Sequence, residues 1–473
     1  MPHRFDPTIL REYDIRGIVG TTLFPADAHA LGRVFAQVLA EAVDLQPTGL
    51  SRGGRRAAVG YDGRLTSPEF EAALVEGLAE GGADVVRIGR GPTPMLYYAA
   101  ATPGTYGGVD GGIMVTGSHN PPDHNGFKLV LGGKPFFGEA IQKLGRMALA
   151  LGPAGGARGR VEEHSVFNDY VERLAKDYDG TRPLTVAWDC GNGATGEVVV
   201  RLVQLLPGRH ILINETIDGS FPAHHPDPTV PENLVQLQQA VKSGRCDLGI
   251  AFDGDGDRIG VVDAKGRILW GDQLLIVLAR DVLTRHPGAP IIADVKASQV
   301  LFDEITRAGG KPVMSQTGHS LIKARLAETG APLAGEMSGH IFYADRYYGF
   351  DDATYVAVRL LGVLARAGES LSEMLDKLPP VFNTPELRVP CEEARKFAAV
   401  EEVRDRLRRR GAEMVEIDGV RVRNSDGWWL MRASNTQAVI VVRAESTSQA
   451  GLERLKEQLA AELAPSGLAL PEY

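Results

Sequence analysis

Short apolar runs alternate with helix-length amphipathic segments along most of this 473-residue chain. The run 57–61 is followed by residues 67–80, where apolar side chains recur at helical spacing after Ser67-Pro68, a typical helix start. Alternation of this kind predicts α/β units with mostly parallel sheets. The further strands predicted in the same way lie at 84–88, 111–115, 184–188, 211–214, 248–252, 259–262, 290–293, 311–314 and 332–334.

The pattern restarts twice, which gives three units of about 100 residues, each opening with a strand that ends near an aspartate: Asp62, Asp189 and Asp294. The rest of the chain combines amphipathic helices at 392–410 and 448–463 with short strands. We therefore predict three related α/β domains with mixed, mostly parallel sheets and a smaller α+β C-terminal domain. The predicted domains span residues 1–157, 158–263, 264–378 and 379–473.

Composition narrows the classes of partner. The 51 Lys and Arg against 60 Asp and Glu give a net charge of −9, which argues against nucleic-acid binding but leaves room for a small phosphate ligand. Three scattered cysteines suggest no disulfide framework and fit a reducing compartment. The N-terminus has no apolar signal-like run, and the uncharged stretch 91–109 is broken by prolines. We therefore predict a cytoplasmic protein without a membrane partner.

The segment Thr116-Gly117-Ser118-His119-Asn120-Pro121-Pro122 directly follows a predicted strand. Ligand chemistry in α/β sheets concentrates at such strand ends, and a serine there can act as a nucleophile when cations are near. The same letters would also suit an ordinary turn. Lys128 follows within possible reach, and the G-x-S-x-G motif of hydrolases is absent around Ser118.

The segment Asp253-Gly254-Asp255-Gly256-Asp257-Arg258 also follows a predicted strand. Three carboxylates at alternate positions in a glycine-rich loop can converge on one hard cation, and Mg²⁺ that also contacts a phosphate suits this donor set. An EF-hand would need glycine at loop position 6 and glutamate at position 12, where this chain has Arg258 and Ala264. Arg258 adds a fixed positive charge for the phosphate.

Three further motifs are less specific, and each is compatible with a functional and a purely structural interpretation. Residues 191–196 match G-x-G-x-x-G after a strand, which is typical of dinucleotide binding or of a tight strand–helix turn. Residues 335–340 place Glu336 and Ser338 in a glycine-flanked loop that could bind vicinal hydroxyls or be a plain turn. Residues 432–436 include Arg, Ser, Asn and Thr side chains. They could form a phosphate-binding loop or an ordinary polar β-turn.

Taken together and in this order, the segments 13–17, 116–121, 253–258, 335–340 and 432–436 resemble the α-D-phosphohexomutase family over nearly the whole chain. The loop Gly-Glu-Met-Ser-Gly-His is similar to that of the phosphomannomutase/phosphoglucomutase branch, whereas phosphoglucosamine mutases typically have Gln at the position of Met337. One departure is that Gln437-Ala438 follow the last motif, where family members often have a proline.

The resemblance implies four domains around a central cleft and a reversible exchange of hexose 1-phosphate and hexose 6-phosphate. Phosphorylated Ser118 would give its phosphoryl group to the sugar, and a hexose 1,6-bisphosphate would turn around and return the other one. One Mg²⁺ per chain would lie on Ser118, Asp253, Asp255 and Asp257. The implied candidates for proton transfer, left unranked, are Lys128, Arg16, His119 and His340.

The same resemblance implies the residues that contact the substrate. Glu336 and Ser338 would bind the sugar 3- and 4-hydroxyls, and Arg258 and His340 would also line the site. The non-reacting phosphate would lie on Arg432, Ser434, Asn435 and Thr436, with Tyr13, Lys296 and His319 nearby. Alternatives are a phosphoglucosamine mutase, a phosphosugar-binding protein without turnover, and a dinucleotide-dependent oxidoreductase. The preferred hexose stays open, as does the choice between monomer and homodimer.

Overall fold

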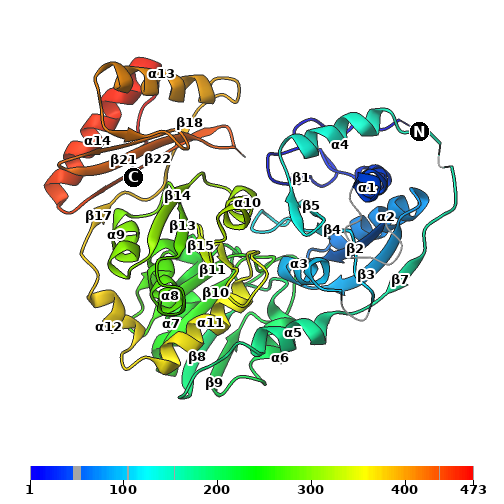
Figure 1. Ribbon diagram of the computed structural model, residues 1–473, viewed down its shortest axis with the longest axis horizontal. Coiled ribbons are helices and arrows are strands. Elements are labelled where there is room, and N and C mark those ends of the chain that lie inside the picture. Colours follow the sequence, from blue (N-terminus) through cyan, green and yellow to red (C-terminus); the bar gives the residue numbers. More distant parts are fainter. Residues whose placement is uncertain (1, 46–54, 104–105, 154, 436, 472–473) are drawn as a thin grey trace.

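The computed structural model of the chain describes all residues except 1, 46–54, 104–105, 154, 436 and 472–473. Figure 1 shows the N-terminal part at one side, the C-terminal part at the other and the middle of the chain between and below them. Among the described helices, none combines the length and the apolar character that a membrane crossing requires.

The first sheet has the order β1-β5-β4-β2-β3-β7, with β6 paired to β5. Strands β4, β2, β3 and β7 run parallel, whereas β5 runs antiparallel to β4 and to β1. The elements of this part are β1 (Ile15–Ile18), α1 (Pro25–Leu45), β2 (Arg56–Tyr61), α2 (Ser67–Glu80), β3 (Asp84–Arg90), α3 (Thr93–Ala101), β4 (Gly111–Val115), β5 (His124–Leu131), β6 (Lys134–Phe136), α4 (Glu139–Leu149) and β7 (Val161–Glu163).

The second sheet has the order β12-β11-β10-β8-β9, in which β10, β8 and β9 are parallel and β11 is antiparallel to β10. The elements here are α5 (Phe167–Ala175), β8 (Leu184–Asp189), α6 (Gly196–Leu202), β9 (Gly208–Ile213), the 3₁₀ turn η1 (Pro231–Leu234), α7 (Val235–Gly244), β10 (Leu248–Phe252), β11 (Ile259–Asp263) and β12 (Ile268–Leu269).

The third sheet has the order β14-β13-β15-β16, with β14, β13 and β15 parallel and β16 antiparallel. Its elements are α8 (Gly271–Arg285), β13 (Pro290–Asp294), α9 (Gln299–Arg307), β14 (Lys311–Ser315), α10 (His319–Thr329), β15 (Leu333–Gly335), β16 (Ile341–Tyr343), α11 (Ala353–Arg366) and α12 (Leu371–Asp376).

These three sheets repeat one arrangement, as the sequence predicted. In each, the first parallel strand lies in the middle (β2, β8, β13), between the second (β3, β9, β14) and the third (β4, β10, β15). The third strand is followed by a loop and an antiparallel strand (β5, β11, β16). The loops after β4, β10 and β15 are the predicted serine, aspartate and glutamate loops, so the same position of each unit carries a site motif.

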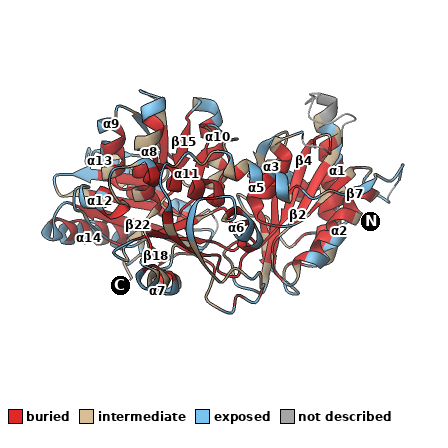
Figure 2. Cartoon of the chain, turned by 90° about the horizontal axis from the view of Figure 1, so that it is seen from below, coloured by how far each residue is buried: buried red, intermediate tan, exposed pale blue. Residues whose placement is uncertain are grey.

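The C-terminal part is an antiparallel sheet of order β17-β22-β21-β20-β19, with β18 paired to β22, and this confirms the predicted α+β domain. Helices α13 and α14 pack on it and enclose a separate apolar core around Trp429 and Leu455. Figure 2 shows buried strands with exposed helix faces outside them. The elements are β17 (Phe382–Asn383), β18 (Leu387–Pro390), α13 (Lys396–Arg409), β19 (Met414–Val415), β20 (Val420–Asn424), β21 (Gly427–Ala433), β22 (Val439–Ser446), α14 (Gln449–Leu463) and η2 (Ala464–Ser466).

The predicted domain boundaries remain predictions. Two strands that follow a predicted boundary in the chain nevertheless pair with the sheet that precedes it. β7 follows residue 157 and still pairs with β3 of the first sheet. β12 follows residue 263 and still pairs with β11 of the second sheet. In both places the chain adds an edge strand to the sheet before the next domain begins. These strands are very short or polar, so the sequence shows no apolar alternation from which they could be predicted.

Candidate functional site

Ser118 lies in the loop between β4 and β5 with its side chain almost fully buried. Its φ of +49° is in the left-handed region, which few residues other than glycine adopt. The backbone N–H of Ser118 donates to Thr116 Oγ1 at 2.8 Å, and its hydroxyl donates to Asp253 Oδ2 at 2.9 Å. The serine loop of the first unit is therefore in direct contact with the aspartate loop of the second.

A buried arginine that the sequence prediction missed holds this loop in shape. The Arg64 side chain has no exposed surface, and its Nε lies 3.3 Å from Asp62 Oδ2. The Asp62 carboxylate also accepts the N–H of Gly117 at 3.3 Å, and a Cβ on Gly117 would lie 2.5 Å from the guanidinium. At distances of 2.6 to 2.9 Å, the Arg64 N–H groups donate to the carbonyls of Ser118, Asn120, Pro121 and His124.

The aspartate loop after β10 brings three buried carboxylates together. Asp253 Oδ1 accepts the N–H groups of Gly256, Asp257 and Arg258 at 3.0 to 3.1 Å, which fixes the loop around it. Burial and the neighbouring carboxylates of Asp255 and Asp257 raise the pKa of Asp253 well above its usual range. Crowding of this kind favours a bound cation.

Two side chains of the first unit reach this loop. Lys128 Nζ, from β5, donates to Asp255 Oδ2 at 2.7 Å and is also ion-paired with Asp257. Thr93 Oγ1, at the start of α3, donates to Asp255 Oδ2 at 2.5 Å. Burial alone would raise the pKa of Asp255, but Lys128 more than offsets this and lowers it. Lys128 therefore acts as a fixed positive charge between the two carboxylates.

The remaining oxygens of this loop fit a metal ion. Asp255 Oδ1 and Asp257 Oδ1 are buried and have no hydrogen-bond partner among the described residues. Asp253, Asp255 and Asp257 each offer an oxygen, and these oxygens lie within 4.8 Å of one another. Oxygen donors of this kind suit a hard divalent cation such as Mg²⁺. The predicted ligands are thus adjacent, with Ser118 Oγ hydrogen-bonded to one of them.

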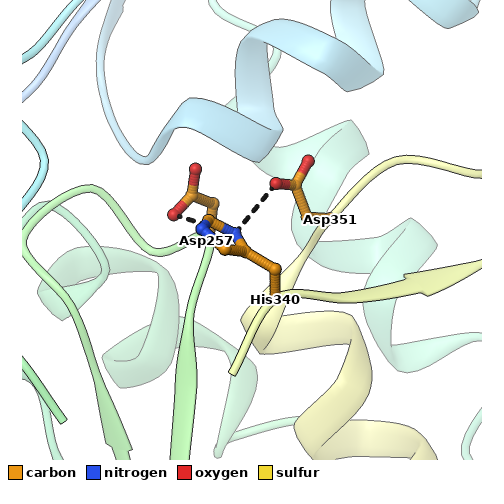
Figure 3. A group of neighbouring side chains, drawn as sticks. All are labelled: Asp257, His340 and Asp351. Carbon is orange, nitrogen blue, oxygen red and sulfur yellow. Dashed lines mark ion pairs between the residues drawn. The ribbon is translucent and has the colours of Figure 1, made fainter. Parts of the chain in front are cut away.

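Arg258 and His340 connect the second and third units. Arg258 Nε donates to His340 Nε2 at 2.9 Å. On the other side of the ring, His340 Nδ1 lies 3.0 Å from Asp351 Oδ2 and 3.5 Å from Asp257 Oδ1 (Figure 3). Asp351 also accepts from Lys323 Nζ at 2.9 Å. Burial by itself raises the pKa of Asp351, but Lys323 and His340 lower it well below its usual range.

The glutamate loop after β15 is held by backbone contacts. Glu336 Oε1 accepts the N–H of Gly318 at 2.5 Å, and its Oε2 accepts from Ser338 Oγ at 3.3 Å. Gly339 has a φ of +90°, and a Cβ there would lie 2.6 Å from the carbonyl oxygen of Ile259 in the second unit. Because this close approach excludes a side chain, the glycine lets the third unit's loop lie against the second.

Tyr13 lies where the first, third and C-terminal parts meet. Its hydroxyl donates to the carbonyl of Thr317 at 2.9 Å and accepts from Asn435 Nδ2 at 2.6 Å. Its ring contacts His319 edge-on, with centroids 5.8 Å apart. Burial raises the pKa of Tyr13 far above its usual value, so the phenol stays neutral. Asn435 and His319, both predicted substrate contacts, are thus adjacent to Tyr13.

Two of the remaining predicted substrate contacts, Arg432 and Lys296, are held by acidic partners. Arg432 Nε donates to Asp418 Oδ2 at 2.8 Å, and the same oxygen accepts the N–H of Thr317 at 3.0 Å. Lys296 Nζ donates to Glu386 Oε2 at 3.0 Å. Ser434 Oγ accepts the N–H of Gln437 at 3.2 Å. Thr436 lies outside the described residues.

The two other candidates for proton transfer lie in or beside the serine loop. His119 Nδ1 is 3.2 Å from Ser118 Oγ. Burial, together with the cations Arg258 and Arg16, lowers the pKa of His119 well below its usual range. Arg16 donates to Asn120 Oδ1 at 3.1 Å and is ion-paired with Asp14. Both groups therefore flank the serine rather than the aspartates.

The G-x-G-x-x-G segment 191–196 supports the aspartate loop. The N–H of Ala194 donates to the carbonyl of Gly254 at 2.9 Å, and a Cβ on Gly193 would lie 2.9 Å from the same oxygen. A Cβ on Gly196 would lie 1.9 Å from the carbonyl of Glu215. Because protein backbone already covers this turn, it favours the tight-turn interpretation over dinucleotide binding.

Comparison with known proteins identifies the family of the chain. Family models described as phosphoglucomutase/phosphomannomutase domains I, II, III and the C-terminal domain match residues 7–150, 168–266, 270–382 and 386–462. The chain belongs to the phosphoglucomutase/phosphomannomutase family. The predicted resemblance and fold class are therefore confirmed.

Individual relatives match almost end to end. The chain is 42% identical over 466 residues to a phosphomannomutase/phosphoglucomutase of Pseudomonas aeruginosa, covering 98% of this chain and 97% of that protein. It is 43% identical over 456 residues to a phosphoglucomutase of Neisseria gonorrhoeae, with 96% of each chain covered. A crystal structure of a phosphoglucomutase/phosphomannomutase family protein from Burkholderia thailandensis gives a TM-score of 0.91 at 42% identity, covering 99% of this chain and all of that one.

Sequence reasoning found the loops but missed the residues that hold them. Asp62, Asp189 and Asp294 were noted only as strand ends. Two of them accept an N–H of a site loop, Asp62 from Gly117 and Asp294 from Met337. That repeated strand-end aspartate was a usable signal. Arg64, Asp351, Lys323, Thr93 and Asp418 lie outside the predicted motifs, so no motif pointed to them.

Proposed function

We propose that this chain is a Mg²⁺-dependent phosphomannomutase/phosphoglucomutase that interconverts hexose 1-phosphate and hexose 6-phosphate. The observation that carries the proposal is the 2.9 Å hydrogen bond from Ser118 Oγ to Asp253, which brings the candidate nucleophile to the candidate metal loop. Asp253, Asp255 and Asp257 would hold Mg²⁺. When bound, this ion supplies charge neutralisation at the transferring phosphoryl group.

The proposed cycle starts from phosphorylated Ser118 and a hexose 1-phosphate. The 6-hydroxyl attacks phosphorus, the bond from phosphorus to Ser118 Oγ breaks, and the hydroxyl proton passes to a base. The resulting hexose 1,6-bisphosphate turns around. Ser118 Oγ then attacks the 1-phosphoryl group, the bond from phosphorus to the sugar O1 breaks, and O1 takes back the proton. Lys128 and Arg258 stabilise the charge on the phosphoryl oxygens in both transfers.

For the proton we propose His340. A guanidinium such as Arg16 keeps its proton, and Lys128 is an ammonium held between two carboxylates. His340 is a histidine, the side chain whose ordinary pKa suits proton transfer near neutral pH. Its Nε2 accepts from Arg258 Nε, and that hydrogen bond would have to break before Nε2 takes the proton. His119, which lies against Ser118 Oγ, is the second candidate and would act at the serine.

For the substrate we propose that Glu336 and Ser338 bind the 3- and 4-hydroxyls, which keep their relation when the intermediate turns. The other phosphate would lie on Arg432, Ser434, Asn435 and Thr436, with Tyr13, Lys296 and His319 at its edge. Glucose and mannose differ at the 2-hydroxyl, so both are proposed substrates. Met337, where phosphoglucosamine mutases typically have Gln, makes a glucosamine phosphate the less favoured alternative. A cytoplasmic location and a monomer or homodimer remain predictions.

The test is turnover of glucose, mannose and glucosamine 1-phosphates with Mg²⁺ and a trace of hexose 1,6-bisphosphate. We expect the glucose and mannose compounds to be converted, and the Ser118→Ala variant to lose most of this turnover. Ser220→Ala, which alters an exposed hydroxyl bonded to Asp218, should leave it unchanged. A purified, folded protein that binds these sugar phosphates without converting any of them would sink the proposal and favour a binding protein.

A further inference from the structure

A single carboxylate oxygen of Asp418 joins the C-terminal part to the third unit. Asp418 lies in the turn between β19 and β20, and its side chain is 13% exposed. Its Oδ2 accepts from Arg432 Nε at 2.8 Å, and the same atom accepts the backbone N–H of Thr317 at 3.0 Å. Beside it, Gln316 Nε2 donates to the carbonyl of Ile417 at 3.0 Å. Two neighbouring residues of the turn therefore contact two neighbouring residues of the loop that follows β14.

The turn that carries Asp418 lies directly on the strand that carries Arg432. Gly419 has a φ of +76°, and a Cβ there would lie 2.2 Å from the carbonyl oxygen of Met431 and 2.9 Å from the Cβ of Arg432. The positive φ and the close approach both require glycine at this position. The backbone therefore holds the carboxylate of Asp418 in a fixed place beside Arg432.

On the side of the third unit, the same contact continues to the glutamate loop. Next to the N–H of Thr317, which donates to Asp418, the N–H of Gly318 donates to Glu336 Oε1 at 2.5 Å. Thr317 Oγ1 also donates to Asp294 Oδ2, at the end of β13, at 3.1 Å. Two adjacent backbone N–H groups thus bind the carboxylate that holds Arg432 and the carboxylate proposed to bind the sugar.

We propose that Asp418 is a positioning residue for substrate binding, which orients the Arg432 guanidinium toward the non-reacting phosphate and sets its distance from Glu336. This inference rests on the proposed mutase function. A hexose phosphate has a limited range of distances between its phosphate and its ring hydroxyls, so both can be bound at once only when Arg432 and Glu336 keep a matching separation. The two N–H groups that bind Asp418 and Glu336 fix that separation.

The geometry at Arg432 leaves the guanidinium able to bind an anion. Asp418 accepts from Nε, and Arg432 makes no hydrogen bond through its Nη atoms to the described residues. An arginine side chain carries five N–H donors in one plane, so four of them stay available for phosphate oxygens. A hydrogen bond at Nε also fixes the orientation of that plane.

The rival interpretation is an ion pair that only stabilises the fold. Arg432 is 6% exposed, and a guanidinium so deeply buried needs a carboxylate partner whether or not it binds phosphate. A pair with that single role would not require the second hydrogen bond of the same oxygen, to the N–H of Thr317 in another unit. This shared oxygen favours positioning over neutralisation alone.

The kinetic test separates the place of the oxygen from its charge. Asp418→Ala should raise KM for glucose 1-phosphate about tenfold or more, as expected for loss of a hydrogen bond to a charged group. It should keep kcat within about threefold, because weaker binding of ground state and transition state alike raises KM alone. Asp418→Asn keeps an oxygen in place without the charge, whereas Asp418→Glu keeps the charge but moves it. Positioning predicts that the Asn variant has the KM closer to the wild type, and neutralisation predicts the reverse.

The matched control is Asp426→Ala, in another turn of the same sheet. Asp426 is 17% exposed, and its Oδ1 accepts from Arg454 Nε at 3.0 Å, so the substitution also removes an aspartate–arginine pair. We expect it to leave KM and kcat at the wild-type values, because Arg454 is an exposed residue of α14 outside the proposed site.

The second readout does not need turnover. In the Ser118→Ala background, calorimetry gives the dissociation constant of glucose 6-phosphate for a double-mutant cycle of Asp418→Ala and Arg432→Gln. Asp418→Ala should weaken binding about tenfold when Arg432 is present and less than about twofold in Arg432→Gln, because no guanidinium is then left to orient.

Equal losses in the two backgrounds, a wild-type KM in Asp418→Ala, or a Glu variant closer to the wild type than the Asn variant would overturn the inference. A wild type that binds glucose 6-phosphate but converts no hexose phosphate would instead overturn the proposed function, and the cycle would still decide the role of Asp418.

Discussion

At the scale of single residues, the site contains buried carboxylates whose mutual repulsion is unfavourable without a cation. The three buried aspartates repel one another, and Lys128 neutralises only part of that charge. Asp255 Oδ1 and Asp257 Oδ1 have no hydrogen-bond partner in the part of the chain that is described. A cation that binds the folded loop and not the unfolded chain must therefore stabilise the fold.

This predicts that Mg²⁺ raises Tm and that Asp255→Asn removes most of the rise. At a Mg²⁺ concentration of 100 times Kd, binding contributes about 2.7 kcal/mol to the free energy of unfolding. The measurement is Tm against Mg²⁺ concentration, with Asp303→Asn, an exposed carboxylate on α9, as the control that keeps the full rise. An equal rise in Asp255→Asn would place the ion elsewhere.

Some residues of the site can be predicted from the sequence and others cannot. Ser118 and the three aspartates were predicted because a glycine-rich strand end concentrates their chemistry within a few positions. Arg64 donates to the carbonyl of Ser118, 54 positions away, and Asp351 accepts from Lys323, 28 positions away. Such pairings follow from how the units pack, and no local pattern records them.

At the scale of elements, the strand–loop–antiparallel strand arrangement explains why the motifs were detectable. The third strand of each unit is buried on both faces and reads as a short apolar run, so the following loop stands out. Helix α11 is the opposite case. It is buried from Ala353 through Ala365, so it shows no polar stripe from which a helix could be predicted.

The close approach of the serine loop and the aspartate loop leads to a second prediction. A Cβ on Gly254 would lie 2.4 Å from the carbonyl oxygen of Ser118, which is backbone and cannot move away cheaply. Gly254→Ala should therefore push the serine loop off the aspartate loop, and misplacement of reacting groups by about 1 Å lowers kcat about 100-fold. The measurement is kcat together with Tm, which overpacking of about 1–3 kcal/mol should lower.

Gly368→Ala is the matched control for this substitution, because a Cβ there meets nothing within 4 Å. It should leave both kcat and Tm near the wild-type values. If Gly254→Ala turned over substrate as fast as Gly368→Ala, the contact between the two loops would not matter for the chemistry.

At the scale of the whole molecule, the first three units and the C-terminal part are joined differently. One continuous apolar core includes residues of the first, second and third units, such as Met95, Trp188 and Leu333. The C-terminal part has its own core and meets the third unit through a small apolar cluster of Val295 with Trp428 and Leu430 and through buried polar contacts. Arg421 donates to the carbonyls of Val295 and Ala297 at 2.7 and 2.9 Å. The part of this attachment that depends on titratable side chains should vary with pH.

The ion pair between Lys296 and Glu386 predicts how the stability of the protein changes with pH. Lys296 lowers the pKa of Glu386 to about 2, against a partial rise from burial, so the folded protein holds this carboxylate ionised more strongly than the unfolded chain does. A depressed carboxyl pKa contributes stability that is present above the unfolded value of 4.5 and is lost as pH falls toward about 2. At neutral pH, Glu386→Gln should therefore lower the free energy of unfolding by about 2 kcal/mol, since the side chain is still 21% exposed.

The measurement is the difference in unfolding free energy between the wild type and Glu386→Gln at a series of pH values. It should be constant from pH 7 to about 5 and shrink between about 4.5 and 2, because the wild-type glutamate then gains its proton and resembles the glutamine. Glu139→Gln, which removes a 79% exposed partner of Arg146 on α4, should change stability little at any pH. A Glu386→Gln difference that stayed constant down to pH 2 would mean that the charge of this pair does not stabilise the fold.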